Sequence, residues 1–442
     1  MRITTDLWQR TREFEQFVAE RTVEYFDGKN LIEHLEVGVR AFLLRSRALV
    51  RVSLSNAEKV RNSVNDELLN LKPYPTVTLD RRKDELAREG RTIFDFGTGD
   101  PRESTPAAIR AAFVRGVPEV SQYPTVAGWP SMRSAAGDYM ARRFGVKLDP
   151  QREVLPTQGS KEAIFHLPLV FVHAARARRL VVYGTPAYPV FEIGALFAEA
   201  RTHALELNVA NEYLLTPDLV GADRLAETAI VFLNYPHNPT GQTMPAALYA
   251  QWVAAREKHG FLLVSDECYA DIYFADPPRS LLEFGRRGCL AVHSLSKRSG
   301  MTGYRSGFIA GDAELIATYR RFRVGMGVAS PDPVQAAAEV AWSDDSHVVE
   351  RRATFAAKRE LLLALFAELG LNVYPGTSTL FLWVEVPAGE SDASYAARLL
   401  ELGIVVSPGS FYGPGQERYI RVALVPPLDA CRAAARLWPR SK

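Results

Sequence analysis

The chain has 442 residues, of which 47% are hydrophobic and 24% charged, a composition typical of globular proteins. Its length exceeds what a single hydrophobic core usually serves, so we expect more than one domain. The 53 Lys and Arg residues nearly balance the 51 Asp and Glu residues, which gives no reason to expect a nucleic-acid or membrane-surface partner.

Three cysteines occur, Cys268, Cys289 and Cys431, without CxxC spacing. They indicate neither a disulfide framework nor a zinc site, and they fit a reducing compartment. No apolar run approaches the length of a membrane span, and the start of the chain lacks the hydrophobic segment of a signal peptide. We therefore expect a cytoplasmic protein without a bound metal.

Residues 1–67 predict two or three amphipathic helices, because hydrophobic side chains recur there at helical spacing. Arginines crowd the later part, which would suit a nucleic-acid arm, although a solvated helix face is the simpler interpretation. The segment contains 11 Lys and Arg and 11 Asp and Glu, so it has no basic excess. No methionine occurs between Met1 and Met132, and a second hypothesis therefore places the true start later in the chain.

The next region, from about Leu71, predicts a helix over 80–89 and then a short strand at 94–96. A glycine-rich turn, which contains Gly99, follows that strand.

Between about 150 and 311, apolar runs alternate with helical segments such as 245–259. Strands that are apolar on both faces and alternate with helices indicate a largely parallel sheet covered on both sides. Ligands of such sheets bind at the carboxyl ends of the strands. The predicted strands are 180–183, 229–233, 261–264, 290–292 and 308–310. From about 325 the chain predicts a second, α+β domain, with helices 335–342 and 348–369 and strands 380–386 and 419–425.

Lys297 follows the predicted strand 290–292 in the segment SLSKRSGMTGYRSG. A desolvated lysine amine near other cations loses its proton more easily, and the neutral amine can form a Schiff base with pyridoxal phosphate. Ser294 and Arg305 are residues of the types that hold phosphate oxygens. An exposed lysine in a polar loop is the alternative.

Polar residues also follow two other predicted strands. Asp266 is placed to keep a pyridine nitrogen protonated, and Tyr269 to hydrogen-bond the phenolic oxygen of the same ring. A surface turn that opens a helix would explain both equally simply. Asn238, in the rigid loop NYPHNPTG, offers an amide donor to the ring or to a substrate carboxylate.

Gly159 and Ser160 form a glycine turn into a helix, whose free backbone N–H groups suit a phosphate. Tyr188 follows another strand, where it would stack on a flat ring or pack in the core. Arg421 stands in an otherwise apolar strand and needs an anionic partner. A substrate carboxylate and a structural salt bridge both satisfy that need.

The order of these residues, within the motifs NYPHNPTG, SDECY and SLSKRSGMTGYRSG, resembles the class I/II aminotransferases of the aspartate aminotransferase type. These are fold type I pyridoxal phosphate enzymes, and the resemblance runs from about Leu71 to the C-terminus. It implies an α/β fold with a mostly parallel central sheet, helices on both faces and a smaller α+β domain. The large cofactor-binding domain would span 116–325, and the small domain would combine 68–115 with 326–442.

By this resemblance Lys297 is the Schiff-base lysine and general base, and Asp266 is the partner of the pyridinium nitrogen. Arg421 would bind the α-carboxylate of the substrate, which Gly99 would contact through its backbone. Tyr123 would reach the phosphate in the neighbouring subunit of a homodimer. The remaining cofactor contacts implied are Gly159, Ser160, Lys161, Tyr188, Asn238, Tyr269, Ser294 and Arg305.

Two further segments, 341–348 and 408–414, look like those of succinyldiaminopimelate aminotransferases of bacterial lysine biosynthesis. The reaction implied is ping-pong transfer of an amino group between N-succinyl-LL-2,6-diaminopimelate and 2-oxoglutarate. Aspartate, alanine and LL-diaminopimelate aminotransferases are the alternatives on the same frame. A transcription regulator with an aminotransferase-like domain is the alternative from another class, although residues 1–67 are short for its DNA-binding module.

Overall fold

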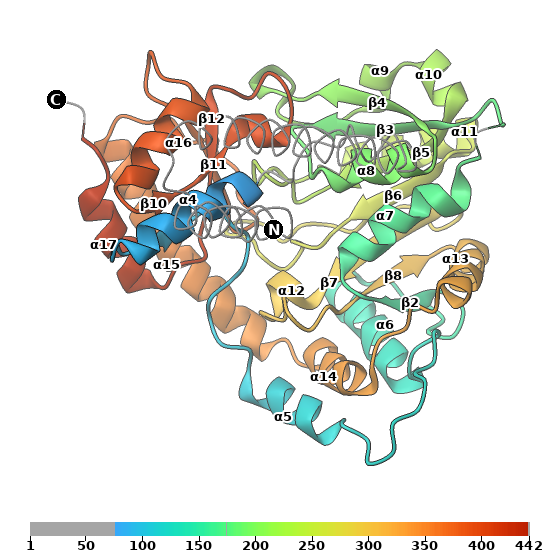
Figure 1. Cartoon of the computed structure of the whole chain (residues 1–442). Helices are drawn as coiled ribbons and strands as arrows, with labels where there is room; N and C mark the ends of the chain where they lie inside the picture. The colour runs from blue at the N-terminus through green and yellow to red at the C-terminus, as the bar shows by residue number, and fades with distance from the viewer. Residues whose placement is uncertain (1–75, 174, 441–442) are drawn as a thin grey trace, which may run out of the picture. The chain divides into compact units, whose positions relative to one another are not determined.

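The computed structural model describes residues 76–173 and 175–440, so the helices predicted within 1–67 lie outside the described part of the chain. Helices and strands alternate along most of the described chain and form a larger and a smaller lobe (Figure 1). In these ranges no helix combines the length and the apolar character needed to cross a membrane.

The larger lobe is built on a seven-stranded sheet with the order β2-β8-β7-β6-β5-β3-β4. Five neighbouring strands, β7, β6, β5, β3 and β4, run parallel to one another. Strand β8 runs antiparallel to both of its neighbours, β2 and β7. The predicted mostly parallel α/β sheet is confirmed. The strands are β2 (Val154–Thr157), β3 (Leu180–Thr185), β4 (Arg201–Glu206), β5 (Thr228–Asn234), β6 (Leu262–Asp266), β7 (Cys289–Ser294) and β8 (Gly307–Gly311).

Two strands of this seven-stranded sheet were not predicted, and both lie at its edges. In β4, exposed and half-buried residues alternate, so the strand lacks the apolar run that marked the inner strands. β2 has four residues and contains Pro156, which breaks the strand pattern but is tolerated at an edge.

Helices cover both faces of this sheet (Figure 1). Alternate residues of one strand enter opposite cores: Val264 packs with one set of helices and Leu263 with the other. The first set is α7 (Ser160–Phe171), α8 (Val190–Phe197) and α13 (Ala313–Met326), and the second is α6 (Pro130–Phe144), α11 (Ala246–His259) and α14 (Asp332–Ser343). The short helices α9 (Pro217–Val220), α10 (Ala222–Glu227) and α12 (Leu295–Arg298) lie in connections, and α5 (Ala107–Arg115) packs on α14.

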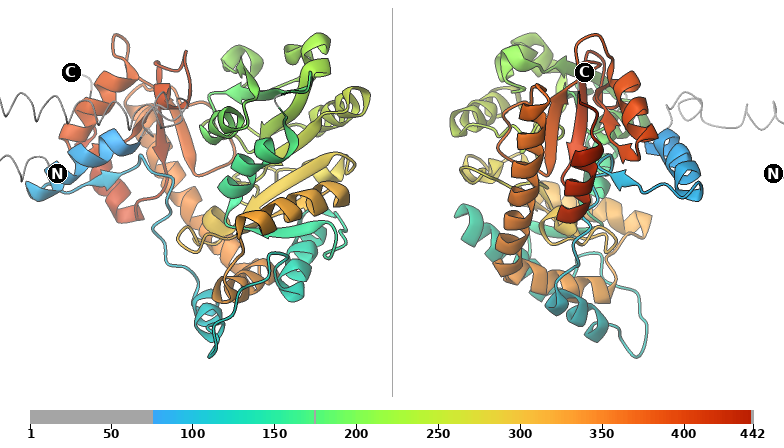
Figure 2. Two further views of the ribbon diagram at one scale, coloured as in Figure 1. Left: turned by 45° about the vertical axis from the view of Figure 1, so that its right-hand side comes forward. Right: turned by 90° about the vertical axis from the view of Figure 1, so that its left-hand side faces the viewer.

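The smaller lobe has its own core around a three-stranded antiparallel sheet (Figure 2). Its strands are β9 (Phe381–Glu385), β11 (Ser407–Pro408) and β12 (Tyr419–Ala423), and β1 (Phe94–Asp95) pairs separately with β10 (Ile404–Val405). The helices of this lobe are α4 (Thr76–Arg88), α15 (Ser346–Glu368), α16 (Asp392–Glu401) and α17 (Leu428–Leu437). The small α+β unit expected from the sequence is therefore present.

Candidate active site

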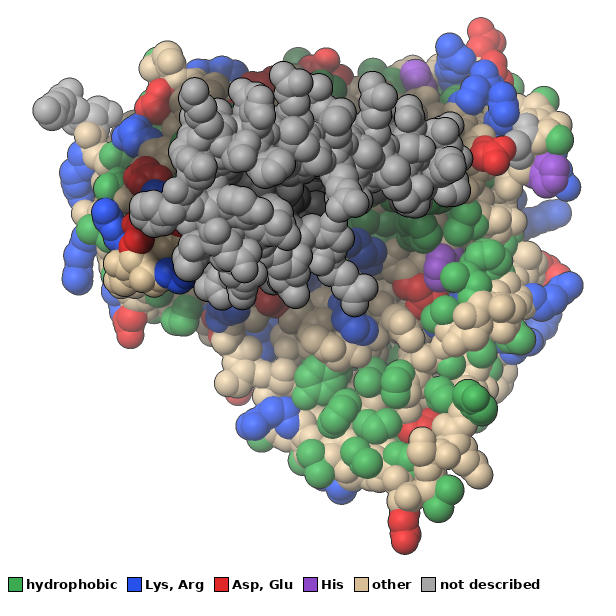
Figure 3. Space-filling view, in the orientation of Figure 1, with side chains coloured by type: hydrophobic (Ala, Val, Ile, Leu, Met, Phe, Trp, Pro, Cys, Tyr) green, Lys and Arg blue, Asp and Glu red, His purple; other side chains and the backbone are tan. Residues whose placement is uncertain are grey.

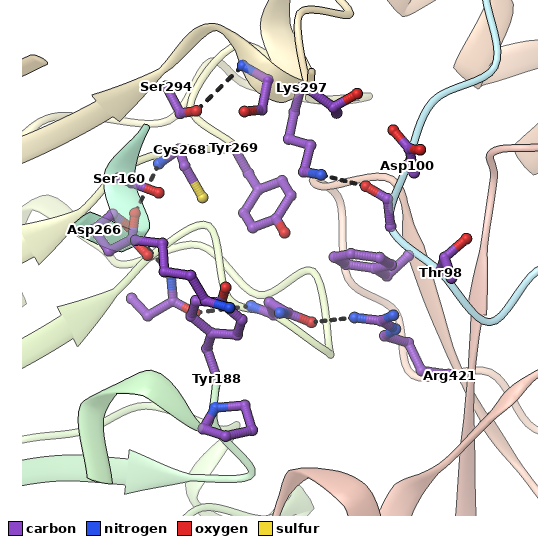
Figure 4. Close-up of a pocket in the computed structure, with 18 of the residues that line it drawn as sticks. Thr98, Asp100, Ser160, Tyr188, Asp266, Cys268, Tyr269, Ser294, Lys297 and Arg421 are labelled. Atoms are coloured by element: carbon purple, nitrogen blue, oxygen red, sulfur yellow. Dashed lines mark hydrogen bonds between the residues drawn. The ribbon is translucent and has the colours of Figure 1, made fainter. Parts of the chain in front are cut away.

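A cavity of about 540 Å³ opens at the carboxyl ends of the central strands, with walls from both lobes (Figure 4). Most of the predicted site residues line it: Gly99, Ser160, Lys161, Tyr188, Asn238, Asp266, Tyr269, Ser294, Lys297, Arg305 and Arg421. Gly159 lies beside the cavity, where a Cβ would come within 2.6 Å of the Arg305 guanidinium. Tyr123 is fully exposed and does not line the cavity of its own chain.

Asp266 is the last residue of β6, and its carboxylate is buried on the cavity wall. Burial raises the pKa of Asp266 to about 6, against the hydrogen bonds from Cys268 that favour the ionised form. The backbone N–H of Cys268 donates to Oδ1 over 3.3 Å. Among the described residues no basic side chain forms a salt bridge with this buried carboxylate, which therefore suits a cationic ring nitrogen.

Asn238 belongs to a loop that is held by hydrogen bonds of the buried residues His237 and Asn234. The Nε2 of His237 lies 3.0 Å from the carbonyl of Pro186, so Nε2 is the donor and Nδ1 accepts from the hydroxyl of Thr240 over 2.8 Å. Burial lowers the pKa of His237 to about 4, which keeps the ring neutral in this tautomer. Asn234, at the end of β5, accepts from the backbone of Asn238 over 3.3 Å.

Lys297 lies in α12, directly after β7, and its amine donates to the carbonyl of Gly99 on the opposite wall (Figure 4). The pKa of Lys297 is lowered to about 8, chiefly by burial; Arg421 and Arg305 act in the same direction, and Cys268 and Asp100 oppose them. A lysine with this pKa supplies a substantial fraction of neutral amine near neutral pH, as a nucleophile or a general base requires.

Buried ion pairs hold the helix α12, which carries Lys297, in place. Its neighbour Arg298 is 3% exposed, and its Nε donates to Asp271 over 2.7 Å. Asp271 also accepts from Arg143 over 3.0 Å and from the hydroxyl of Tyr139 over 3.0 Å. These buried charges are paired, so they fix the position of α12 rather than taking part in chemistry.

One end of the cavity carries the groups expected for a phosphate. The N-terminus of α7, which begins at Ser160, faces this end and presents free backbone N–H groups. Arg305 has a backbone φ of +53°, which is unfavourable for a residue with a side chain and holds its guanidinium at the cavity. Its Nη1 lies 3.5 Å from the hydroxyl of Ser296, and Ser294 lines the same end.

Arg421 enters the cavity from β12 of the smaller lobe. It donates to Oδ1 of Asn238 over 3.0 Å and to the carbonyl of Gly97 over 2.7 Å. The guanidinium lies over the ring of Phe381 at 4.0 Å, and its Nε has no hydrogen-bond partner in the described chain. Its partners here are neutral oxygens, so the salt-bridge alternative finds no support among the described residues.

The cavity fits pyridoxal phosphate on these observations. A buried carboxylate, a lysine of lowered pKa and a phosphate-type donor set lie around a single space, with Tyr188 on its wall. When bound, this cofactor supplies an electron sink that delocalises the charge left by removal of a substrate α-proton. Asp266 would hold the ring nitrogen, Lys297 the aldehyde carbon, and the α7 N-terminus with Arg305 the phosphate.

Sequence reasoning missed several wall residues, namely Thr98, Asp100, Asn234, Cys268, Phe381, Ser407 and Tyr412. Asn234 had a signal, since it opens the same motif as Asn238 and ends a strand. Phe381, Ser407 and Tyr412 come from the smaller lobe, and their contact with the cavity depends on how the two lobes pack together.

The sequence matches the family described as Aminotransferase class I and II over residues 91–437. The LL-diaminopimelate aminotransferase of Aquifex aeolicus is 34% identical over 378 residues, which cover 84% of this chain and 97% of that protein. A second protein of that name, from Dehalococcoides mccartyi, is 33% identical over 81% of this chain and 93% of its own length.

Two solved structures share the fold over most of their length. An aminotransferase from Neisseria meningitidis superposes with a TM-score of 0.78 at 30% identity, covering 85% of this chain and all of that chain. A probable N-succinyldiaminopimelate aminotransferase from Thermus thermophilus gives 0.76 at 26%, covering 82% and 98%. The chain therefore belongs to the class I and II aminotransferase family and is a pyridoxal phosphate-dependent aminotransferase.

Proposed function

We propose that this aminotransferase moves an amino group from an amino acid of the diaminopimelate type to 2-oxoglutarate. The observation that carries the proposal is the similarity to LL-diaminopimelate aminotransferases over nearly their whole length. These relatives favour unsubstituted LL-diaminopimelate, the alternative donor of the sequence analysis. N-succinyl-LL-diaminopimelate is the second candidate, favoured by the Thermus thermophilus structure and by segments 341–348 and 408–414.

In this proposal the substrate enters between the two lobes with its α-carboxylate on Arg421 and the backbone of Gly99. The unpartnered Nε of Arg421 supports that role, because it leaves a buried donor available to an anion. Lys297 removes the α-proton as general base, and Asn238 and Tyr269 contact the ring oxygen of the cofactor. Ping-pong turnover follows, because the amino group stays on the enzyme between the two half-reactions.

The active enzyme is proposed to be a homodimer. Hydrophobic side chains gather over the part of the surface where α5 and α14 lie (Figure 3). Val114, Val117 and Val120 are 70%, 59% and 71% exposed, and Tyr123 follows them. A second copy that covers this surface would remove apolar area from water. It would also bring Tyr123 of one copy towards the cavity of the other. The cytoplasmic location predicted from the cysteines is part of the same proposal.

Comparative turnover tests the donor. Initial rates with 2-oxoglutarate are measured for LL-diaminopimelate, N-succinyl-LL-diaminopimelate, aspartate and alanine at equal concentrations. We expect kcat/KM for a diaminopimelate donor to exceed that for aspartate by about 100-fold, which corresponds to about 2.7 kcal/mol of discrimination. Faster turnover of aspartate or alanine would reject the proposed donor and leave the aminotransferase assignment intact.

A separate measurement addresses the regulator alternative. Salt-sensitive DNA binding that disappears on removal of residues 1–67 would support a transcription regulator. Steady turnover without DNA binding would support the enzyme alone.

A further inference from the structure

The cavity contains a carboxylate that neither the sequence nor the family assignment explains. Asp100 lies on the wall formed by the segment 97–101, and its Oδ1 is buried without a hydrogen-bond partner in the described chain. A buried, unpaired carboxylate oxygen is costly unless a donor reaches it during function. Thr98 and Arg421 contribute the other unpartnered buried side-chain atoms on the cavity wall.

The amine of Lys297 is a candidate for that donor. This amine donates to the carbonyl of Gly99, the residue directly before Asp100 (Figure 4). A Cβ on Gly99 would stand 3.9 Å from the same nitrogen, so the backbone of this segment is in contact with the lysine. Asp100 is among the groups that raise the pKa of Lys297.

Other titratable groups face the same cavity, namely Lys161, Tyr188, Asp266, Cys268, Tyr269, Arg305, Tyr412 and Arg421. Burial lowers the pKa of Lys297 most, and the two arginines act in the same direction. Cys268 would oppose them only as a thiolate, but burial raises its pKa well above the ordinary value, so the thiol stays protonated. Asp266 would pair with the ring nitrogen of the cofactor, so it is not available to Lys297. Asp100 is then the carboxylate left to stabilise a positive charge on Lys297.

We propose that Asp100 is a positioning residue that holds the ammonium of released Lys297 at the Gly99 carbonyl while the proton is transferred. The substrate Cα–H bond breaks, its proton passes to the neutral amine of Lys297, and the electron pair stays with the substrate carbon. The amine becomes an ammonium, which Asp100 and the Gly99 carbonyl stabilise without accepting the proton. The same ammonium then returns the proton. The role does not depend on which amino donor the enzyme uses.

The test uses the cofactor-loaded full-length enzyme and the variant Asp100→Asn, which removes the charge and keeps the shape. The visible absorbance of the bound cofactor is titrated with pH, since it reports the protonation of the nitrogen that Lys297 contributes. Removing an anion near a cation lowers the pKa of the cation, so the midpoint should fall by about one pH unit. The kcat should fall about tenfold or more, while the KM for 2-oxoglutarate changes little.

Two comparisons separate this role from a structural one. Thr98→Val removes the neighbouring unpartnered hydroxyl without changing charge, and the titration midpoint should stay at the parental value. Asp100→Glu keeps the charge, so its titration midpoint should lie close to the parental value. If Asp100→Asn does not fold, Asp100→Ser takes its place. The proposal is overturned if Asp100→Asn or Asp100→Ser, folded and loaded with cofactor, keeps the parental midpoint. This holds whatever the activity of the variant.

Discussion

The guanidinium of Arg421 donates a hydrogen bond of 3.0 Å to Oδ1 of Asn238. Arg421 belongs to β12 of the smaller lobe, and Asn238 follows β5 of the larger one, so the bond joins the lobes inside the cavity. A second bond, to the carbonyl of Gly97, holds the guanidinium plane. The arginine proposed to bind the substrate carboxylate is thus oriented by the protein itself.

Replacing Arg421 by lysine should weaken the binding of the amino donor and of 2-oxoglutarate to the same extent. Arg421→Lys keeps the charge but loses the planar fork that makes parallel hydrogen bonds to a carboxylate. We expect kcat/KM to fall about 100-fold for the amino donor and for 2-oxoglutarate, mainly through KM. Steady-state kinetics measure the change, and an unaltered cofactor absorbance serves as the control. A loss confined to one of the two substrates would contradict a shared α-carboxylate site.

Cofactor capture should depend on pH through Lys297. Its folded-state pKa of about 8 leaves roughly a tenth of the amine neutral at pH 7 and most of it neutral at pH 9. The rate at which the cofactor-free enzyme forms its covalent bond to pyridoxal phosphate should therefore rise about tenfold over this interval. Stopped-flow absorbance measures it. Lys297→Ala is the control and should show no covalent phase at either pH, and a flat parental profile would argue against the lowered pKa.

Asp266 should reduce the stability of the cofactor-free protein. Burial raises its folded-state pKa from 3.8 to about 6, so the protonated form is favoured by folding, and stability from this group is lost as pH rises through that interval. Asp266→Asn should make the cofactor-free protein more stable by roughly 2–3 kcal/mol at pH 8 and by less at pH 5.

Urea unfolding of the cofactor-free proteins at the two pH values measures this difference. The same variant should be nearly inactive, since the ring nitrogen loses its anionic partner. An equal effect at pH 5 and pH 8 would show that the substitution acts through packing rather than through ionisation.

The ion pairs behind Lys297 should be important for folding. Asp271→Asn leaves Arg298 and Arg143 without their shared carboxylate, and Arg298 is buried. We expect a loss of about 3–5 kcal/mol in the free energy of unfolding, measured by urea denaturation. The matched control is Glu401→Gln, which breaks an exposed pair with Arg82 and should leave the unfolding midpoint unchanged. Equal effects of the two substitutions would refute the argument from burial.

The inner sheet and the residues at its carboxyl edge were predictable, because buried parallel strands are apolar on both faces and end at a common edge. Asp266, Lys297 and Asn238 all follow such strands. Edge strands β2 and β4 lack that signal. The helices 335–342 and 348–369 and the strands 380–386 and 419–425 were found to within a few residues, as α14, α15, β9 and β12.

Side-chain contacts between residues that lie far apart in the chain were not predictable from one sequence. Phe381 lies against Arg421, and Ser407 donates to the carbonyl of Gly97 over 2.7 Å, yet these residues are far apart in the chain. Neither hydrophobic spacing nor motif order encodes such pairs, because they depend on the packing of whole elements. The contact of the segment around Asp100 with Lys297 was missed for the same reason.

Three backbone oxygens of the segment 97–105 accept hydrogen bonds from basic side chains. The carbonyls of Gly97, Gly99 and Ser104 accept from Arg421, Lys297 and Arg351. A main-chain oxygen is present whatever the side chain is, so a substitution at Ser104 leaves an acceptor for Arg351 in place. Gly97 and Gly99 have less freedom to change, because a Cβ at these positions would come within 3.1 Å of Val405 and 3.0 Å of Phe381.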